Sequence, residues 1–241
     1  MKILCVIPSR IGSTRLARKP LLPIQGKPMI AWVYENASRC NVIQDFVVAT
    51  DSEEIAKVIT DIGGNVIMTD PEIKTGSDRV AVVAQHYPDA DVIINLQGDE
   101  PFIKPFMLEQ LVMPYLIGEK PDMTTLAYPL DMTHKYKDPG SVKVLVDLRG
   151  NAIYFSRSPI PYFRSEGTAP VYHHMGLYAF RRDFLLTFTS LPQTPLEKIE
   201  SLEQLRALEH GYRIRVCLTE ERTLEINTYE EYLQAQQFVY T

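Results

Sequence analysis

The sequence predicts an α/β protein whose mostly parallel sheet carries helices on both faces, with an elaborated second half. Short apolar runs alternate with segments of helical spacing through the first half of the 241 residues. The joints between these segments are short, which is typical of parallel β–α units. No sharp change in composition divides the chain, so we expect a single domain over residues 1–241.

Each element of the first half has its own signal. The run at residues 3–7 predicts a buried strand, because it is short, rich in branched side chains and closed by a proline. Helical spacing with a proline at its start predicts a helix at 28–39. Further strands are expected at 45–50, 65–68 and 91–96. A helix capped by Asp51 and Ser52 should run to residue 61, and one capped by Ser77 should run to about residue 87.

In the second half of the chain, the sequence predicts more strands than helices. Strands are expected at 123–128, 142–147, 152–155, 173–180 and 213–218, and helices at 197–209 and 229–238. The strands at 142–147 and 152–155 should form a hairpin around Leu148-Arg149-Gly150. The proline-rich stretch at 158–170 is interpreted as a substrate or subunit loop.

Composition excludes several classes of protein. The isoelectric point near 5.6 is unlike that of a nucleic-acid-binding or membrane-surface protein. Cys5, Cys40 and Cys217 are widely spaced and form no metal or redox pair. No apolar run approaches the roughly 18–20 residues of a membrane span, and no signal-peptide pattern precedes the first strand. We expect a soluble, cytoplasmic protein that binds neither nucleic acid nor a membrane.

A loop rich in basic side chains, called the basic loop below, follows the first predicted strand. Residues 1–34 carry six basic side chains and no acidic one, whereas residues 35–241 carry 19 basic and 30 acidic side chains. The six are Lys2, Arg10, Arg15, Arg18, Lys19 and Lys27. Open α/β sheets bind ligands at the carboxyl ends of strands, and arginine suits phosphate oxygens. The loop therefore indicates phosphate binding, with a basic surface loop or a nucleic-acid contact as the alternative.

An acidic pair follows the strand expected at 91–96, in the segment QGDEP at 97–101. Carboxylates at the mouth of a buried strand suit Mg²⁺, which prefers oxygen ligands and is often shared with nucleotide phosphates. The pair could instead cap the helix after Pro105. The metal interpretation gains support because the basic loop and this pair would meet at one edge of the sheet.

Several motifs stand in one register across nearly the whole chain. They are SRIGSTRLARKPL followed by GKPMI, VVATD at 47–51, TGSDR at 75–79, QGDEP at 97–101, YFSRSPIP at 154–161, HHMGLYAF at 173–180 and LEQLRALEHG at 202–211. Together they resemble the 3-deoxy-manno-octulosonate (KDO) cytidylyltransferases, and QGDEP with YFSR and LEQLR is far more specific than any one motif. Neither a Walker A sequence nor GxGxxG is present.

The resemblance implies a Rossmann-like nucleotidyltransferase fold and an Mg²⁺-dependent reaction of CTP with KDO that gives CMP-KDO and pyrophosphate. The anomeric hydroxyl of KDO would attack the α-phosphorus of CTP in line, without a covalent enzyme intermediate. A homodimer and a role in lipopolysaccharide biosynthesis are also implied. Residues 1–120 would mainly bind CTP, and residues 121–241 would mainly bind the sugar and form the dimer contact.

The resemblance also assigns site residues by matching position. Arg10, Lys19 and Asp99 would be the catalytic residues. The nucleotide-binding set is Pro8, Ser9, Arg10, Ser13, Arg15, Lys19, Ala49, Thr50, Asp51, Ser77 and Arg79. The sugar-binding set is Gln97, Arg157, His174, Tyr178, Glu203 and Gln204. The metal ligands would be Asp99 and Asn227.

Structural roles remain open for several of these side chains. Arg79 and Arg157 could form surface ion pairs. His174 and Tyr178 lie four residues apart on one face of a predicted strand, where packed core residues would also lie. The pair at 203–204 could lie on a solvated helix face.

Two positions depart from the family pattern. The basic loop has Ala17-Arg18 where the family usually has Pro-Gly before the lysine, and we expect Arg18 to be solvated. Asn227 stands where the family usually has an aspartate as second metal ligand. An amide oxygen still coordinates Mg²⁺, so we expect a working enzyme with Asn227 as a neutral ligand and Glu225 as a candidate helper.

Two other functions remain open on the sequence. The sugar could be a related acidic one, such as amino-KDO or a sialic-acid-like sugar, which the 158–170 loop and the pocket residues would decide. The chain could also bind nucleotide without catalysis, a hypothesis that Ala17-Arg18 and Asn227 motivate.

Overall fold

A computed structural model describes residues 1–12, 16–165 and 170–238. The chain groups into two compact units. Unit 1 consists of Met1–Glu109 with Arg222–Thr241, and unit 2 consists of Gln110–Glu221. The single domain over residues 1–241 stays a prediction, because compactness does not reveal whether either unit folds alone. No helix within the described ranges has the length and apolar composition that a membrane span needs.

Unit 1 is built on a parallel sheet. Its strands are β1 (Ile3–Ser9), β4 (Asp45–Thr50), β5 (Asn65–Met68) and β6 (Val92–Asn95), in the order β6-β1-β4-β5. β1 lies between two neighbours, and its side chains at 3–7 are fully buried. An apolar run without alternation is what a strand covered on both faces requires.

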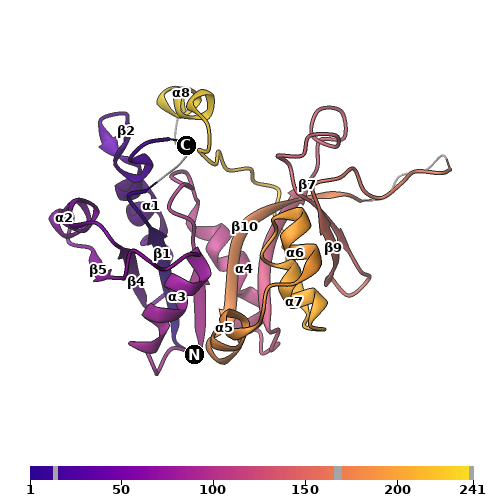
Figure 1. Ribbon diagram of the computed structural model, residues 1–241, viewed down its shortest axis with the longest axis horizontal. Coiled ribbons are helices and arrows are strands. Elements are labelled where there is room, and N and C mark those ends of the chain that lie inside the picture. Colours follow the sequence, from indigo (N-terminus) through magenta and orange to yellow (C-terminus); the bar gives the residue numbers. More distant parts are fainter. Residues whose placement is uncertain (13–15, 166–169, 239–241) are drawn as a thin grey trace. The chain divides into compact units, whose positions relative to one another are not determined.

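Three helices of unit 1 connect these strands (Figure 1). α1 (Met29–Ala37) and α2 (Glu53–Asp61) carry the chain from β1 to β4 and on to β5, and they pack against each other. α3 (Gly76–Gln85) returns it to β6, on the other side of β1. Right-handed crossovers in opposite directions put α1 and α2 on one face and α3 on the other. The predicted α/β class is therefore confirmed.

The C-terminal helix α8 (Tyr229–Gln237) belongs to unit 1 and lies beside the short hairpin of β2 (Pro23–Ile24) and β3 (Lys27–Pro28) (Figure 1). The hydroxyl of Tyr232 and Nε2 of Gln236 both donate to the Pro23 carbonyl, at 2.9 and 2.6 Å. Their shared apolar cluster contains Leu16, Ile24, Met29, Phe102, Ile226 and Ala235. The helix thus fixes the segment that follows η1 (Lys19–Leu21), a 3₁₀ turn in the basic loop.

Unit 2 holds the elaborated second half, and its sheet is mixed. Its strands are β7 (Met123–Pro129), β8 (Lys143–Val146), β9 (Ala152–Ser156), β10 (Tyr172–Arg181) and β11 (Ile214–Leu218). β10 is antiparallel to β7 and β8, and β11 is parallel to β7. Its helices are α5 (Arg182–Ser190), α6 (Pro195–Glu200) and α7 (Leu205–Glu209), and α4 (Pro105–Leu116) leads into the unit.

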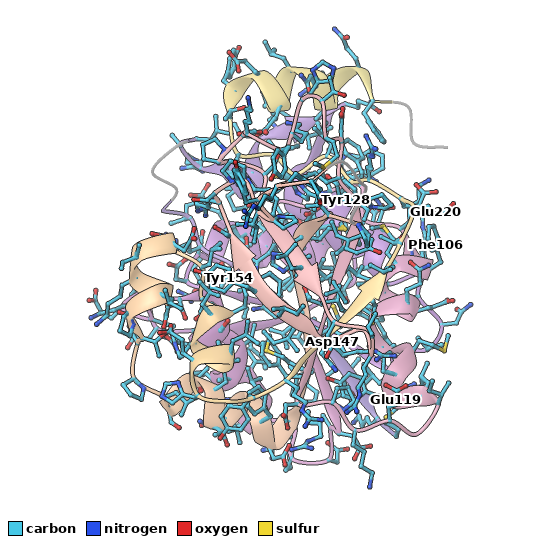
Figure 2. All side chains as sticks on the ribbon, turned by 90° about the vertical axis from the view of Figure 1, so that its right-hand side faces the viewer. Phe106, Glu119, Tyr128, Asp147, Tyr154 and Glu220 are labelled. Atoms are coloured by element: carbon cyan, nitrogen blue, oxygen red, sulfur yellow. The ribbon has the colours of Figure 1, made fainter. Side chains whose placement is uncertain are left out.

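The predicted hairpin of β8 and β9 is confirmed. Asp147, labelled in Figure 2, closes its turn by accepting hydrogen bonds from the backbone nitrogens of Arg149 and Asn151, both at 2.8 Å. Tyr154, also labelled there, donates from β9 to Oε1 of Glu200 in α6 at 3.5 Å. The hairpin is therefore tied to the helical part of its own unit.

Several details differ from the prediction, including the unpredicted hairpin of β2 and β3. Thr75, not Ser77, caps α3, and its hydroxyl accepts from the Asp78 nitrogen at 3.0 Å. The single helix expected at 197–209 is two helices, α6 and α7, because Ser201 takes a left-handed conformation with φ 52°. Helix α5 follows β10 directly and has no counterpart in the sequence-based prediction.

A bulge interrupts β10 between Met175 and Tyr178. His174 pairs with Ala127 and Tyr178 with Thr125, so His174 and Tyr178 share a face, as predicted. In a regular strand four residues span about 13 Å. The bulge brings the two ring centroids to 5.5 Å, which makes them direct neighbours.

Candidate active site

A cavity of about 270 Å³ opens in unit 1 at the carboxyl ends of β1 and β6; it is called the β1–β6 cavity below. The strand order reverses here, since β4 and β5 extend the sheet to one side of β1 and β6 to the other. Open α/β sheets bind ligands at such a reversal. The described lining residues are Pro8, Ser9, Arg10, Gly12, Lys19, Pro20, Ile73, Lys74, Thr75, Gly76, Arg79, Gln97, Gly98 and Asp99. Four of them are cationic and one is a carboxylate, so the cavity suits a polyanion.

The loops after β1 and β6 meet at Gly98. A Cβ atom at this position would lie 3.2 Å from the Pro8 carbonyl oxygen and 3.5 Å from Ser9 Oγ. The absence of a side chain lets the 97–101 segment close on the end of β1. Asp99 is thereby brought to the basic loop, as the sequence predicts.

Arg79 lies near the start of α3 and is 2% exposed. Its guanidinium donates to Thr69 Oγ1, and its NH2 nitrogen lies 3.9 Å from an oxygen of Asp51. Burial lowers the pKa of Arg79 and nearby Arg10 lowers it further, while Asp51 opposes the change. The NH2 nitrogen has no hydrogen-bond partner among the described residues. An anionic ligand would offset both the burial and the repulsion from Arg10.

Lys19 joins the basic loop to two oxygen-bearing side chains. Its Nζ donates to Asp99 Oδ2 at 2.6 Å and to Asn227 Oδ1 at 3.2 Å. Asn227 is fixed at the start of α8, where its backbone nitrogen donates to Glu231 Oε2 at 2.7 Å and Thr228 caps the helix. The other carboxylate oxygen, Asp99 Oδ1, is buried without a hydrogen-bond partner in the described part of the chain. The side-chain oxygens of Asp99 and Asn227, which are far apart in the sequence, thus both accept hydrogen bonds from the Lys19 ammonium group.

Two further carboxyl groups interact with Asp99. Burial, followed by repulsion from Glu225, raises the pKa of Glu100 well above its ordinary value. Loss of hydration and then repulsion from Asp99 raise the pKa of Glu225, although this residue as a whole is exposed. Burial is the main cause of both raised pKa values, and the added repulsion among these carboxyl groups is negative charge that a divalent cation would offset.

The oxygens of Asp99 and Asn227 fit a magnesium ion. Mg²⁺ prefers hard oxygen ligands, and it is commonly held by one or two protein groups together with substrate phosphates and water. Within the described ranges, no group of three or more His, Cys, Asp or Glu side chains could hold a metal alone. The donor set therefore suits a metal shared with a polyphosphate.

A second polar cluster lies in unit 2, around His174. Its Nε2 lies 2.9 Å from Thr125 Oγ1, and its Nδ1 lies 3.5 Å from Gln204 Nε2. Desolvation and then nearby His173 lower the pKa of His174 to about 3. The imidazole is thus neutral near pH 7 and serves as a hydrogen-bonding group rather than a cation.

Arg157, at the end of β9, is held by backbone carbonyls. Its guanidinium donates to the carbonyl oxygens of Glu200 at 2.9 Å, Pro139 at 3.1 Å and Ser201 at 3.5 Å. Its own carbonyl accepts from Nζ of the fully buried Lys143 at 2.6 Å. These contacts differ from the surface ion pair considered as the alternative role of Arg157.

Comparison with known proteins identifies the family. The family model described as cytidylyltransferase matches residues 4–214. The chain is 56% identical over 239 residues to the 3-deoxy-manno-octulosonate cytidylyltransferase of Acaryochloris marina, which covers 99% of this chain and 98% of that protein. The chain belongs to the cytidylyltransferase family. The equivalent enzyme of Synechococcus elongatus is 50% identical over 232 residues, which is 96% of this chain and 95% of that protein.

Solved structures agree with this assignment. The structure of a CMP:2-keto-3-deoxy-manno-octonic acid synthetase complexed with CTP has a TM-score of 0.91 and 40% identity, covering 99% of this chain and all of that one. A cytidylyltransferase from Leptospira borgpetersenii has a TM-score of 0.66 at 18% identity, over 98% of this chain and 85% of that one. The second likeness concerns the fold alone. The predictions of a nucleotidyltransferase and of its Rossmann-like fold are confirmed.

The β1–β6 cavity of this cytidylyltransferase gathers many of the predicted site residues. Those in its described lining are Pro8, Ser9, Arg10, Lys19, Arg79, Gln97 and Asp99. Asn227 joins them through its hydrogen bond with Lys19. The roles assigned to these residues stay predictions.

Other predicted residues lie elsewhere. Ala49, Thr50, Asp51 and Ser77 are not in the described lining of the cavity. Arg157, His174, Tyr178, Glu203 and Gln204 belong to unit 2, where Glu203 Oε1 lies 3.6 Å from Arg206. Ser13 and Arg15 lie outside the described residues.

Several features were missing from the sequence-based site, among them the cationic lining residue Lys74. Thr75 lines the cavity and caps α3, and the pattern Thr-x-x-Asp at 75–78 is the signal that could have indicated it. Gly98 is required by close backbone approach, and a glycine shortly after the end of a buried strand could have suggested this. Thr125 contacts His174 from a buried strand, and no local pattern marks it.

The structure describes Arg18, one of the two residues that stand in the basic loop where the family usually has Pro-Gly. Its side chain is 56% exposed and forms an ion pair with Glu54, so the expected solvation is confirmed. Its backbone is left-handed, with φ 55°, a conformation that glycine adopts without steric cost. The loop therefore keeps a glycine-type turn although the residue is an arginine.

Proposed function

We propose that this cytidylyltransferase forms CMP-KDO and pyrophosphate from CTP and KDO. The observation that carries the proposal is the β1–β6 cavity, which four cationic side chains and Asp99 line and where Lys19 contacts the oxygens of Asp99 and Asn227. The names of the relatives support the choice of substrates: two are KDO cytidylyltransferases, and one solved synthetase carries CTP.

The nucleotide occupies the cavity in this proposal. Arg10 and Lys19 bind the triphosphate, assisted by Arg15, and buried Arg79 contributes its unpaired nitrogen. The amino-terminal end of α3 adds its positive dipole at the same place. The remaining residues proposed for nucleotide recognition are Pro8, Ser9, Ser13, Ala49, Thr50, Asp51 and Ser77.

Mg²⁺ is the cofactor in this proposal, with Asp99 and Asn227 as its protein ligands. Bound by these two side chains, the ion would supply positive charge that offsets the negative charge of the phosphates. Asn227 presents its amide oxygen because its Nδ2 donates to Glu225 Oε1, so Glu225 helps indirectly. The protein residues fix where the oxygens lie before the nucleotide arrives.

The sugar acid is held by polar groups of a different kind. The proposed residues are Gln97, Arg157, His174, Tyr178, Glu203 and Gln204. Neutral His174 and the amide of Gln204 suit hydroxyl groups, whereas Arg157 suits the carboxylate only if its carbonyl contacts loosen. The anomeric oxygen of KDO then forms a bond to the α-phosphorus while the bond to the pyrophosphate oxygen breaks. The enzyme contributes positioning and charge stabilisation.

The wider setting of the enzyme is part of the same proposal. We infer a homodimer with contacts from residues 121–241, because family members resemble one another in this respect. The reaction takes place in the cytoplasm, and its product enters lipopolysaccharide biosynthesis. Binding of nucleic acid or of a membrane plays no part in it.

A sugar competition tests the proposal. Purified protein receives CTP and Mg²⁺ with KDO, amino-KDO and a sialic acid at equal concentrations, and phosphorus NMR identifies each CMP-sugar. We expect CMP-KDO in about tenfold excess or more over the others. Preference for another acidic sugar would overturn KDO as the substrate, but cytidylyl transfer from CTP would remain the reaction. The absence of every CMP-sugar would overturn the catalytic function.

A further inference from the structure

Lys19 makes contacts that binding of a triphosphate does not explain. Its Nζ lies 2.6 Å from Asp99 Oδ2 and 3.2 Å from Asn227 Oδ1, the two side chains proposed above as magnesium ligands. The ion pair is sheltered, because the side chains of Lys19 and Asp99 are only 12% and 20% exposed. An ammonium group therefore stands where the two oxygens converge.

The oxygens are held in place before any ligand binds. The Nδ2 of Asn227 donates to Glu225 Oε1, which leaves its Oδ1 as the group facing Lys19. Asp99 follows Gly98, whose close approach to Pro8 fixes the loop. Without a cation, the sheltered carboxylate would lack its partner, which is costly.

We propose that Lys19 occupies the magnesium position in the nucleotide-free enzyme and moves to the triphosphate when Mg²⁺ arrives with CTP. This inference rests on the proposed function for the identity of the metal. The lysine stem is flexible and its ammonium has three rotatable donors, so the group can change partners. Mg²⁺ needs its oxygens at about 2.0–2.1 Å, which leaves no room for an ammonium bonded to the same oxygens.

The exchange couples the metal to the nucleotide. A free divalent cation must break the Lys19–Asp99 ion pair, and it brings no phosphate oxygen to accept the displaced ammonium. CTP brings phosphate oxygens that accept this ammonium while the metal takes the carboxylate. The nucleotide-free enzyme should therefore bind divalent cations weakly, and the metal should enter with CTP.

Manganese binding without nucleotide tests the exchange. Mn²⁺ reports occupancy directly by electron paramagnetic resonance, so no turnover is needed. We expect Lys19→Met to bind Mn²⁺ at least about tenfold more tightly than the wild type, because a like charge leaves the position. If Lys19→Met removed a group that helps to bind the metal, its Mn²⁺ affinity would fall instead of rising. The direction of the change in affinity therefore distinguishes the two roles of Lys19.

Arg18→Met is the matched control. It removes the same charge from the neighbouring position, but Arg18 is exposed and pairs with Glu54 rather than with Asp99. We expect its Mn²⁺ affinity to stay within about twofold of the wild type. In the double variant Lys19→Met with Asp99→Asn, the gain should disappear, because the carboxylate that binds the ion is gone.

Two outcomes would overturn the proposal. One is an unchanged Mn²⁺ affinity in folded Lys19→Met, with Lys19→Gln as the second variant if the first does not fold. The other is an equal gain in Arg18→Met, which would assign the effect to general charge. Formation of CMP-KDO by the wild type is measured separately, so failure of the exchange and failure of the proposed function are distinguishable.

Discussion

His174 is enclosed in unit 2 with Thr125 and Gln204 at its two ring nitrogens. Desolvation, with a smaller effect of His173, lowers its pKa from 6.5 to about 3. The unfolded chain takes up a proton below pH 6.5, whereas the folded protein resists protonation down to about pH 3. The lowered pKa of His174 therefore makes its full contribution to the free energy of unfolding above pH 6.5. This contribution is lost as the pH falls toward 3.

We expect the unfolding free energy of the wild type to fall more steeply with acid than that of His174→Gln. The difference in slope should approach, and not exceed, about 1.4 kcal/mol per pH unit below pH 6.5. Urea unfolding at pH 7, 6 and 5 measures both slopes, and effects of other groups cancel in the difference. Parallel slopes would contradict the account of His174.

Among the elements of unit 2, helices α6 and α7 are joined across the break at Ser201 by a buried ion pair. Arg206 donates from Nε to Glu197 Oε2 at 3.0 Å and from NH2 to Oε1 at 2.6 Å, and both side chains are 5% exposed. The guanidinium also stacks over Phe188, at 4.9 Å from its ring centre. Helices this short are not stable alone, so the pair and its packing hold them together.

Arg206→Leu should lower the unfolding free energy by about 3–5 kcal/mol, because it leaves the Glu197 carboxylate buried without its partner. Adding Glu197→Gln should recover part of this loss. Lys57→Leu is the matched control, since it breaks an exposed ion pair with Asp61 and should cost less than about 1 kcal/mol. Denaturant unfolding measures all of them. Equal losses in the buried and the exposed variants would contradict the role of the pair.

The sequence predicted those elements whose signals are local. The parallel strands of unit 1 and the hairpin at 142–155 follow from apolar runs and turn residues, and the structure has them at nearly the same positions. The break at Ser201 could not be predicted, because 197–209 contains neither glycine nor proline and no local pattern marks the left-handed conformation of Ser201. Lys143 likewise carries no local sign of its burial among carbonyls.

At the scale of the whole molecule, the candidate site of unit 1 was largely predictable. Parallel strands end at one edge, so the loop with Lys19 and the segment with Asp99 had to be neighbours. The contribution of Asn227 came from the family resemblance, since no local pattern relates residue 227 to residue 19. Contacts such as that of Thr125 with His174 depend on tertiary packing and lay beyond sequence patterns.

The proposed transfer of a cytidylyl group from CTP to KDO at the β1–β6 cavity is tested by pyrophosphate release from the purified protein. CTP, KDO and Mg²⁺ are omitted one at a time, and ATP, GTP and UTP are used in place of CTP. We expect release only with all three and with CTP strongly preferred, and a loss of at least about a hundredfold in folded Asp99→Ala. Release without KDO, or a near-normal rate in Asp99→Ala, would contradict the claim.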